Sequence, residues 1–356
     1  MISSKTAFGF ALKARESAAR HFISRIVPMA SFGISKLDSP MVHLDSSVKM
    51  LSQSSPIGIF DSGVGGLTVL KEVSRQLPQE SIVYFGDTAR LPYGDRSPAE
   101  ILQYVREILN WMTTQGVKMV IMACNTSSAL ALDLVAKEYP FPILGVILPG
   151  ARAATQRGKR IGVLATPATA SSHAYRHAIL NLQPQAKVWE IGCPEFVPLI
   201  EGNCLADPET HNVVKLYMSL LLDQQIDTLI YGCTHYPHLH PLIQRIAPPT
   251  LQIINPASYV VEQARQDLDR LHALCQPNPS GLHLQQQTTF SVSGDPDRFA
   301  ALATQWLGYQ PTVQHLDISA YGTGLPPAAR MSALESRGLE GKGLSAFNAE
   351  IQEAVA

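Results

Sequence analysis

The chain has 356 residues, of which 46% are hydrophobic and 16% are charged, which is enough to build the cores of about two globular domains. Its formal net charge of −1 gives no general attraction to nucleic acid or to an anionic membrane, so neither partner is expected. No apolar run approaches the roughly 20 residues of a membrane-spanning helix. Five cysteines at scattered spacings do not suggest a disulfide framework, so we expect reduced thiols and a cytoplasmic location.

The first 55 residues differ in composition from the rest of the chain. They are rich in Ser and Ala, and basic residues outnumber acidic ones up to Lys36. This composition resembles an organellar transit peptide. An upstream in-frame start is the alternative, because Met29, Met41 and Met50 could each begin a shorter chain. Either interpretation predicts that residues 1–55 form an N-terminal extension outside the fold, and organelle targeting stays open.

Short apolar segments alternate with turns and helical patterns from Pro56 onward. Strands are predicted at 56–60, 81–87, 117–123, 160–165, 187–191 and 226–232. These segments lack polar alternation, which is typical of parallel sheets that helices cover on both faces. Because ligands of such sheets bind at the carboxyl ends of the strands, the residues that follow each strand are the candidates for a site.

Helices are predicted between these strands. Ser97 and Glu100 form a capping box with Pro98 at the first helical position, and apolar residues follow on one helical face. A second helix is predicted within residues 65–77, directly after a glycine-rich turn. The pattern therefore indicates α/β units.

Polar residues recur at matching places in two parts of the chain. Cys124 and the following Asn-Thr pair come after one apolar strand, and Cys233 with Thr-His comes after another, 109 residues later. Ser62 and Thr166 follow two further strands at a spacing of 104 residues. This repetition predicts two quasi-symmetric doubly wound α/β domains, although coincidence between short apolar motifs remains an alternative.

The segment DSGVGGLTVL, which starts at Asp61, combines a strand end, a glycine turn and a helix start. Backbone N–H groups at a helix N-terminus bind carboxylates as well as phosphates. The segment lacks the further glycine of a dinucleotide fingerprint and the Lys-Ser/Thr pair of a P-loop. A plain tight turn is equally compatible with the glycines, but the polar pair Asp61 and Ser62 favours a ligand site. Tyr93, in the loop that precedes the capped helix, could be a buried anchor or a ligand contact.

Four possible zinc ligands crowd into one segment, namely Cys233, His235, His238 and His240. Pro237 and Pro241 prevent a helix from aligning the histidines, and the sequence holds no paired Cys-x-x-Cys to complete a structural site. We therefore expect no metal.

Two of the cysteines have a chemical context that the other three lack. Cys124 and Cys233 end strands and are followed by hydroxyl, amide and imidazole groups, whereas the others fit inert buried thiols. His235 can favour the thiolate of Cys233, and Asp61 could accept or relay a proton on the other side. One thiolate could remove a proton from one face of a planar carbanion while the other thiol protonates the opposite face. No lysine stands in these motifs, so no pyridoxal cofactor is expected and hydrogen bonds would stabilise the anion.

Six ordered motifs closely resemble the glutamate racemases of the aspartate/glutamate racemase superfamily, over Ile57 to Leu316. They are GIFDSGVGGLTV, YFGDTARLPYG, ACNTSSA, GVLATPAT, CPEFVPLIEG and YGCTHYPHL. The resemblance implies a cofactor-independent enzyme that interconverts L- and D-glutamate for peptidoglycan synthesis. Glutamate is the expected ligand and a homodimer the expected assembly.

The resemblance also assigns roles to residues. It makes Cys124 and Cys233 the two acid/base thiols, with Cys124 serving D-glutamate and Cys233 the L-enantiomer, and it has Glu201 orient His235. Its catalytic set is completed by Asp61. The substrate-binding set that it implies is Asp61, Ser62, Tyr93, Gly94, Asn125, Thr126, Thr166, Thr169, Thr234 and His235.

The domain division that the resemblance implies joins 56–151 with 262–316 as the first domain. Residues 152–261 form the second domain, the active site lies at the interface, and 317–356 form a C-terminal extension. Three other functions stay open: another racemase of the superfamily, such as an aspartate racemase; a non-catalytic amino-acid-binding protein; and a zinc enzyme.

Overall fold

The computed structural model describes residues 52–276, 287–322 and 324. Within them every strand pair is parallel, in two separate sheets. The strands are β1 (Ile57–Asp61), β2 (Ile82–Gly86), β3 (Met119–Met122), β4 (Ile143–Gly145), β5 (Arg160–Ala165), β6 (Lys187–Gly192), β7 (Thr228–Gly232), β8 (Gln252–Ile254), β9 (Thr288–Val292) and β10 (Val313–His315). The predicted α/β class with parallel sheets is confirmed.

Helices connect the strands in the α/β manner. The α-helices are α2 (Leu67–Gln76), α3 (Pro98–Thr114), α4 (Asn125–Leu130), α5 (Leu132–Val135), α6 (Ile147–Thr155), α7 (Pro167–Ser172), α8 (Ala174–Leu182), α9 (Phe196–Glu201), α10 (Pro208–Leu222), α11 (His240–Ile246), α12 (Pro256–Arg270) and α14 (Pro296–Leu307). Short 3₁₀ turns are η1 (Thr88–Arg90), η2 (Tyr93–Asp95), η3 (Tyr236–Leu239) and η4 (Ile318–Tyr321). Across these described ranges, no helix is both long and apolar enough to span a membrane.

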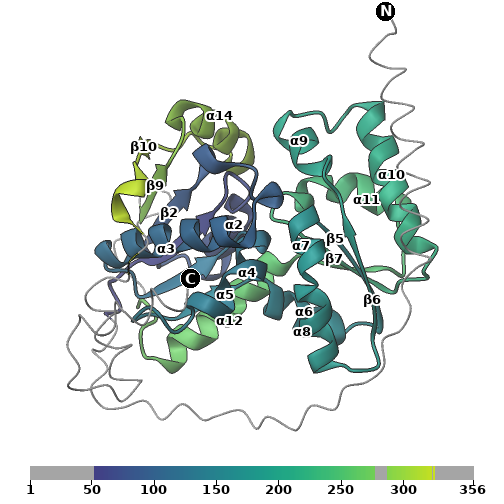
Figure 1. Cartoon of the computed structure of the whole chain (residues 1–356), viewed down its shortest axis with the longest axis horizontal. Coiled ribbons are helices and arrows are strands. Elements are labelled where there is room, and N and C mark those ends of the chain that lie inside the picture. Colours follow the sequence, from purple (N-terminus) through teal and green to yellow (C-terminus); the bar gives the residue numbers. More distant parts are fainter. Residues whose placement is uncertain (1–51, 277–286, 323, 325–356) are drawn as a thin grey trace, which may run out of the picture.

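The two sheets repeat one topology. The first sheet has the order β10-β9-β2-β1-β3-β4 and the second has the order β6-β5-β7-β8. The order β2-β1-β3-β4 thus recurs as β6-β5-β7-β8, which agrees with the repetition seen in the sequence. Figure 1 shows the two sheets side by side, the first in the left lobe and the second in the right lobe.

Apolar side chains cover both faces of each sheet. One core cluster joins strands β1 to β3 to α2, α12 and α14 and continues into the second lobe under α9, α10 and α11. A second cluster lies between the other face of the first sheet and α3, and a third lies between the second sheet, α6 and α8. A continuous core therefore links the two lobes.

The predicted capping box is present, because Ser97 Oγ accepts the backbone N–H of Glu100, and the Glu100 carboxylate accepts that of Ser97. The predicted domain boundaries near 151 and 261 fall inside α6 and α12, so this division stays a prediction. The first lobe also continues beyond Leu316, since Ile318 of η4 is buried in the α3 cluster. Residues 52–55 of the predicted N-terminal extension also contact the first lobe, because the backbone carbonyl of Gln53 accepts Lys118 Nζ at 2.8 Å. The rest of the predicted extensions, 1–51, 323 and 325–356, lies outside the described residues.

Candidate active site

The carboxyl ends of strands from both lobes face a shared pocket. Asp61 ends β1 and Cys124 follows β3, while Thr166 follows β5 and Cys233 follows β7. The pocket has a volume of about 30 Å³. Its lining consists of Ser62, Leu91, Pro92, Tyr93, Gly94, Cys124, Asn125, Thr126, Thr166, Val197, Cys233, Thr234 and His235. The two cysteines of the sequence repeat therefore meet at one small cavity, called here the inner pocket.

Cys233 belongs to a chain of three side chains. Its Sγ lies 3.7 Å from Nδ1 of His235, whose Nε2 lies 2.9 Å from Oε1 of Glu201. Burial alone would lower the pKa of His235, but the contacts with Cys233 and Glu201 outweigh it and raise the pKa to about 10. The imidazole is therefore a cation at neutral pH, and it lies beside the Cys233 sulfur.

Cys124 has a different environment. Burial and then the negative charge of Asp61 raise its pKa to about 12, against hydrogen bonds from Ser127 and with a smaller contribution from Cys233. At neutral pH this thiol keeps its proton. On the first lobe the pocket thus holds the protonated thiol of Cys124. On the second lobe it holds the Cys233 sulfur beside the His235 imidazolium.

Asp61 lies behind the pocket wall and bonds to both lobes. Its Oδ2 accepts the backbone N–H of Gly63 at 3.0 Å, and its Oδ1 accepts the hydroxyl of Thr234 at 3.3 Å. Burial raises the pKa of Asp61, while the charge of His235 and these hydrogen bonds oppose that rise. The raised pKa allows Asp61 to hold a proton without facing solvent.

A group of three hydroxyls crosses the lobe boundary. Thr126 Oγ1 lies 3.0 Å from that of Thr166 and 3.1 Å from that of Thr169, and the last two are 2.9 Å apart. Thr169 is fully buried and stands behind the pocket wall. Asn125 accepts the Tyr175 hydroxyl through Oδ1 at 2.7 Å, which leaves its amide NH₂ free of that bond. Hydroxyl and amide groups can therefore serve as ligands for a carboxylate.

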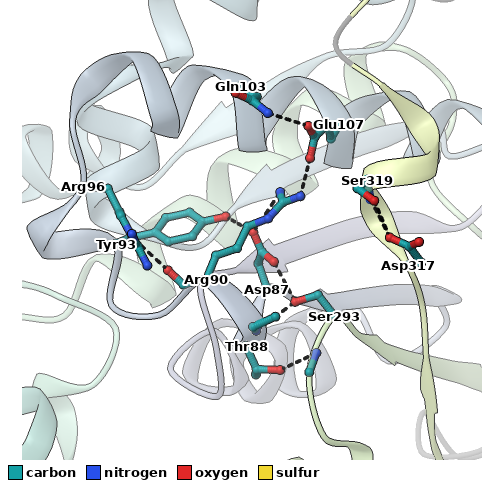
Figure 2. Close-up of polar contacts among 12 residues, drawn as sticks. Asp87, Thr88, Arg90, Tyr93, Arg96, Gln103, Glu107, Ser293, Asp317 and Ser319 are labelled. Carbon is teal, nitrogen blue, oxygen red and sulfur yellow. Dashed lines mark hydrogen bonds and ion pairs between the residues drawn. The ribbon is translucent and has the colours of Figure 1, made fainter.

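The Tyr93 hydroxyl bonds to Asp87, which does not line the pocket, and Figure 2 shows this contact and its neighbours. Its hydroxyl donates to Oδ2 of Asp87 at 2.5 Å, and Ser293 donates to Oδ1 of the same carboxylate at 2.7 Å. Arg90 adds an ion pair to Asp87 at 3.5 Å and another to Glu107 at 2.5 Å. The Tyr93 hydroxyl is therefore engaged, and the residue offers the pocket its ring and backbone.

The sequence profile of the family described as Asp/Glu/Hydantoin racemase matches residues 57–264, which is more than half of the chain. The chain belongs to this family. The glutamate racemase of Rippkaea orientalis is 60% identical over 266 residues, which cover 75% of this chain and 92% of that protein. The glutamate racemase of a Synechocystis strain is 58% identical over 277 residues, covering 77% and 96%.

Solved structures agree with this membership of the Asp/Glu/Hydantoin racemase family. A glutamate racemase isoform of Bacillus anthracis superimposes with a TM-score of 0.70 at 36% identity, over 74% of this chain and 98% of that one. The Francisella tularensis glutamate racemase, solved in complex with D-glutamate, gives 0.69 at 33% identity, over 76% and 100%.

In this racemase-family chain the histidines that were possible zinc ligands contact different partners. His235 bonds Glu201, His240 Nδ1 lies 2.9 Å from the Tyr231 hydroxyl, and His238 stacks on Trp306. Among the described residues, no group of three or more His, Cys, Asp or Glu side chains is arranged to hold a metal ion. The crowding in sequence does not become a ligand cluster in space.

Several residues of the site were not predicted as functional. Leu91, Pro92 and Val197 line the inner pocket, and all three stand inside motifs that the resemblance used, so their signal was present. Tyr175 holds Asn125 of the pocket, and Ser293 holds Asp87, the partner of Tyr93; both stand in segments outside those motifs. Their roles depend on contacts across the fold.

An outer cleft of about 640 Å³ adjoins the inner pocket. The two share Leu91, Pro92, Gly94, Thr166 and Val197 as lining residues. Glu201 lines the outer cleft, so it supports His235 from the solvent side of the inner pocket. The outer cleft therefore lies next to the inner pocket on the side of these shared residues.

Proposed function

We propose that the protein is a glutamate racemase that interconverts L- and D-glutamate without a cofactor. The observation that carries the proposal is the meeting of Cys124 and Cys233 at one buried pocket, from equivalent strand ends of two lobes. The names of relatives at 58% to 60% identity support glutamate as the substrate. A D-glutamate complex in the same family, at 33% identity, supports it further.

The two thiols divide the proton transfers in this proposal. Cys233, beside the His235 cation, acts as the base that removes the α-proton of L-glutamate, and that proton goes to sulfur. Cys124, a protonated thiol at neutral pH, donates its proton to the opposite face of the carbanion. For D-glutamate the roles reverse: the proton of the Cys124 thiol passes to Asp61, the Cys124 thiolate removes the α-proton, and Cys233, protonated by His235, donates its proton to the opposite face. Glu201 keeps His235 oriented and charged.

Neutral groups and the His235 cation hold the substrate in this proposal. Among the described residues, no Lys or Arg side chain lines the inner pocket, so the carboxylates of glutamate would be bound by hydroxyl, amide and backbone N–H donors. The proposed contacts are those of Ser62, Tyr93, Gly94, Asn125, Thr126, Thr166, Thr169, Thr234 and His235. Hydrogen-bond donors in a dry pocket stabilise developing negative charge more strongly than they would in water.

Substrate entry requires the lobes to separate. The inner pocket has about 30 Å³, and a single water needs about 10–15 Å³ on such a measure, so the space fits waters but not glutamate. Opening of the lobes along the outer cleft would admit the substrate, and closure would exclude water. We further propose that the protein is cytoplasmic, on its cysteine usage, and, on the resemblance alone, that it acts as a homodimer and supplies D-glutamate for peptidoglycan.

The direct test is incubation of the purified chain with L-glutamate, followed by separation of the enantiomers. The protein is dialysed against a chelator and kept reduced, and no pyridoxal phosphate is added. D-glutamate should accumulate until the two enantiomers are equal, while L-aspartate in a parallel reaction should stay unchanged. Conversion that appears only after addition of pyridoxal phosphate, or of aspartate alone, would contradict the proposal.

A further inference from the structure

Trp306 of the first lobe contacts two histidines of the second lobe. Its ring centroid lies 5.6 Å from that of His235 at an interplanar angle of 85°, and 3.8 Å from that of His238 at 35°. Trp306 is 8% exposed and His235 is 2% exposed, so little water reaches this contact. The indole does not line the inner pocket. It therefore reaches the imidazole of the site from outside.

The hydrogen bonds of His235 leave one motion of its ring free. Glu201 holds Nε2 at 2.9 Å, and Cys233 Sγ lies 3.7 Å from Nδ1. These two partners fix the line through Nδ1 and Nε2, and the ring can still rotate about that line and so change its tilt. Trp306 packs edge-to-face against the imidazole, an arrangement with a preferred geometry for aromatic rings. This third contact limits the tilt that the hydrogen bonds allow.

The helix that carries Trp306 and the histidine that packs on its ring are both held in place. Its helix, α14, is anchored on the first sheet by Phe299, whose ring lies 5.9 Å from Tyr84 and 6.5 Å from Phe290. On the other side lies His238, whose pKa is lowered to about 4 by burial and by the charges of His235 and Lys71. A neutral imidazole can stack on an indole without adding a second positive charge.

We propose that Trp306 is a positioning residue for one half of the reaction, the proton transfer through Cys233. It would hold His235 in the tilt that serves this thiol, and it would do so only when the lobes are closed. The inference rests on the proposed racemase function. Because His235 contacts Cys233 and the Cys124 thiol bonds to Ser127 instead, loss of the indole should slow one proton transfer selectively.

The experiment compares Trp306→Leu with wild type in both directions. A misplacement of about 1 Å can cost roughly 100-fold in rate, so a partial loss of alignment should lower kcat by roughly 10- to 100-fold. The deciding measurement is the primary isotope effect on kcat/KM with α-deuterated L- and D-glutamate. It should rise in the direction in which Cys233 removes the α-hydrogen and fall toward 1 in the other direction.

Two further variants control for structural damage. Trp111→Leu removes an equally buried indole, 3% exposed and packed on Phe85 at 5.3 Å in the α3 core, and it should leave both isotope effects at their wild-type values. Trp306→Phe keeps an aromatic ring and should give a smaller change in the same direction, which tests the inference if the leucine variant does not fold.

The outcomes separate the inference from the proposed function. Opposite changes of the two isotope effects would support it. A lower rate with both isotope effects unchanged would mean that Trp306 only maintains the folded fraction, and it would overturn the inference, as would wild-type rates in both Trp306 variants. Wild-type protein that fails to racemise glutamate would overturn the proposed function first.

Discussion

Gly65 lies where the glycine turn of the first lobe meets the catalytic side chains of the second. A Cβ at this position would overlap Oγ1 of Thr234 and lie 2.5 Å from Nδ1 of His235. Ordinary contact begins near 3.4 Å, so the imidazole would have to retreat by about 0.9 Å. The turn therefore needs glycine at position 65 for close approach.

We predict that Gly65→Ala lowers kcat by roughly 100-fold, because a misplacement near 1 Å has about that cost. This loss corresponds to about 2.7 kcal/mol of transition-state stabilisation. The assay is racemisation of L-glutamate over a range of substrate concentrations, with thermal unfolding measured in parallel to show that the variant is folded.

Gly63→Ala is the matched control in the same turn. A Cβ at Gly63 would meet the end of the Leu91 side chain at 3.1 Å, and a flexible side chain can yield by a few tenths of an ångström. This variant should keep most of its activity. A folded Gly65→Ala protein with wild-type kcat, or an equal loss in Gly63→Ala, would refute the reasoning.

Three further predictions concern other parts of the account. The pKa of His235 is raised to about 10, so the ion pair of its imidazolium with Glu201 contributes its full stability below the ordinary histidine pKa. That contribution is lost as pH rises through about 10. Glu201→Gln should therefore move the alkaline limb of the kcat/KM profile to lower pH, and an unmoved limb would contradict this. Tyr93→Phe should lower the free energy of unfolding by about 1–3 kcal/mol, because the buried carboxylate of Asp87 loses the hydrogen bond that the Tyr93 hydroxyl donates. Denaturant unfolding measures this, and a neutral result would show that the hydroxyl is dispensable. Removal of residues 1–50 should leave a folded, active enzyme, since the match to the racemase family begins at residue 57; a truncated protein that is insoluble beside an active full chain would argue otherwise.

The sequence was sufficient to predict the strand ends and the polar residues that follow them. Cys124, Cys233 and the capping box of Ser97 are readable because each depends on neighbours in the chain, namely an apolar strand before or a helix pattern after. The repeat spacing also predicted two related halves, and the topology agrees. These features are local or periodic, so they can be recognised in the sequence without knowledge of the tertiary contacts.

The supporting contacts could not be predicted in this way. Ser293 holds Asp87 across 206 residues, and Trp306 meets His235 only because α14 returns to the first lobe. Lys118 is fully buried, although lysine usually lies at the surface; it pairs with Glu80 at 2.6 Å and donates to two backbone carbonyls. Such partners are set by the tertiary arrangement, and nothing in the neighbouring sequence identifies them.

The central claim is that two thiols on opposite faces of the substrate carry out the reaction, and one labelling measurement tests it most directly. The purified chain is incubated with L-glutamate in heavy water without any cofactor, and both enantiomers are recovered at low conversion. With Cys124 and Cys233 as separate acid and base, deuterium should appear at the α-carbon of D-glutamate and hardly at all in the recovered L-glutamate. Single Cys124→Ser and Cys233→Ser variants should form no D-glutamate, because a serine hydroxyl is too weak an acid to replace a thiol. Heavy early labelling of recovered L-glutamate, or a serine variant that racemises near the wild-type rate, would contradict the two-thiol mechanism.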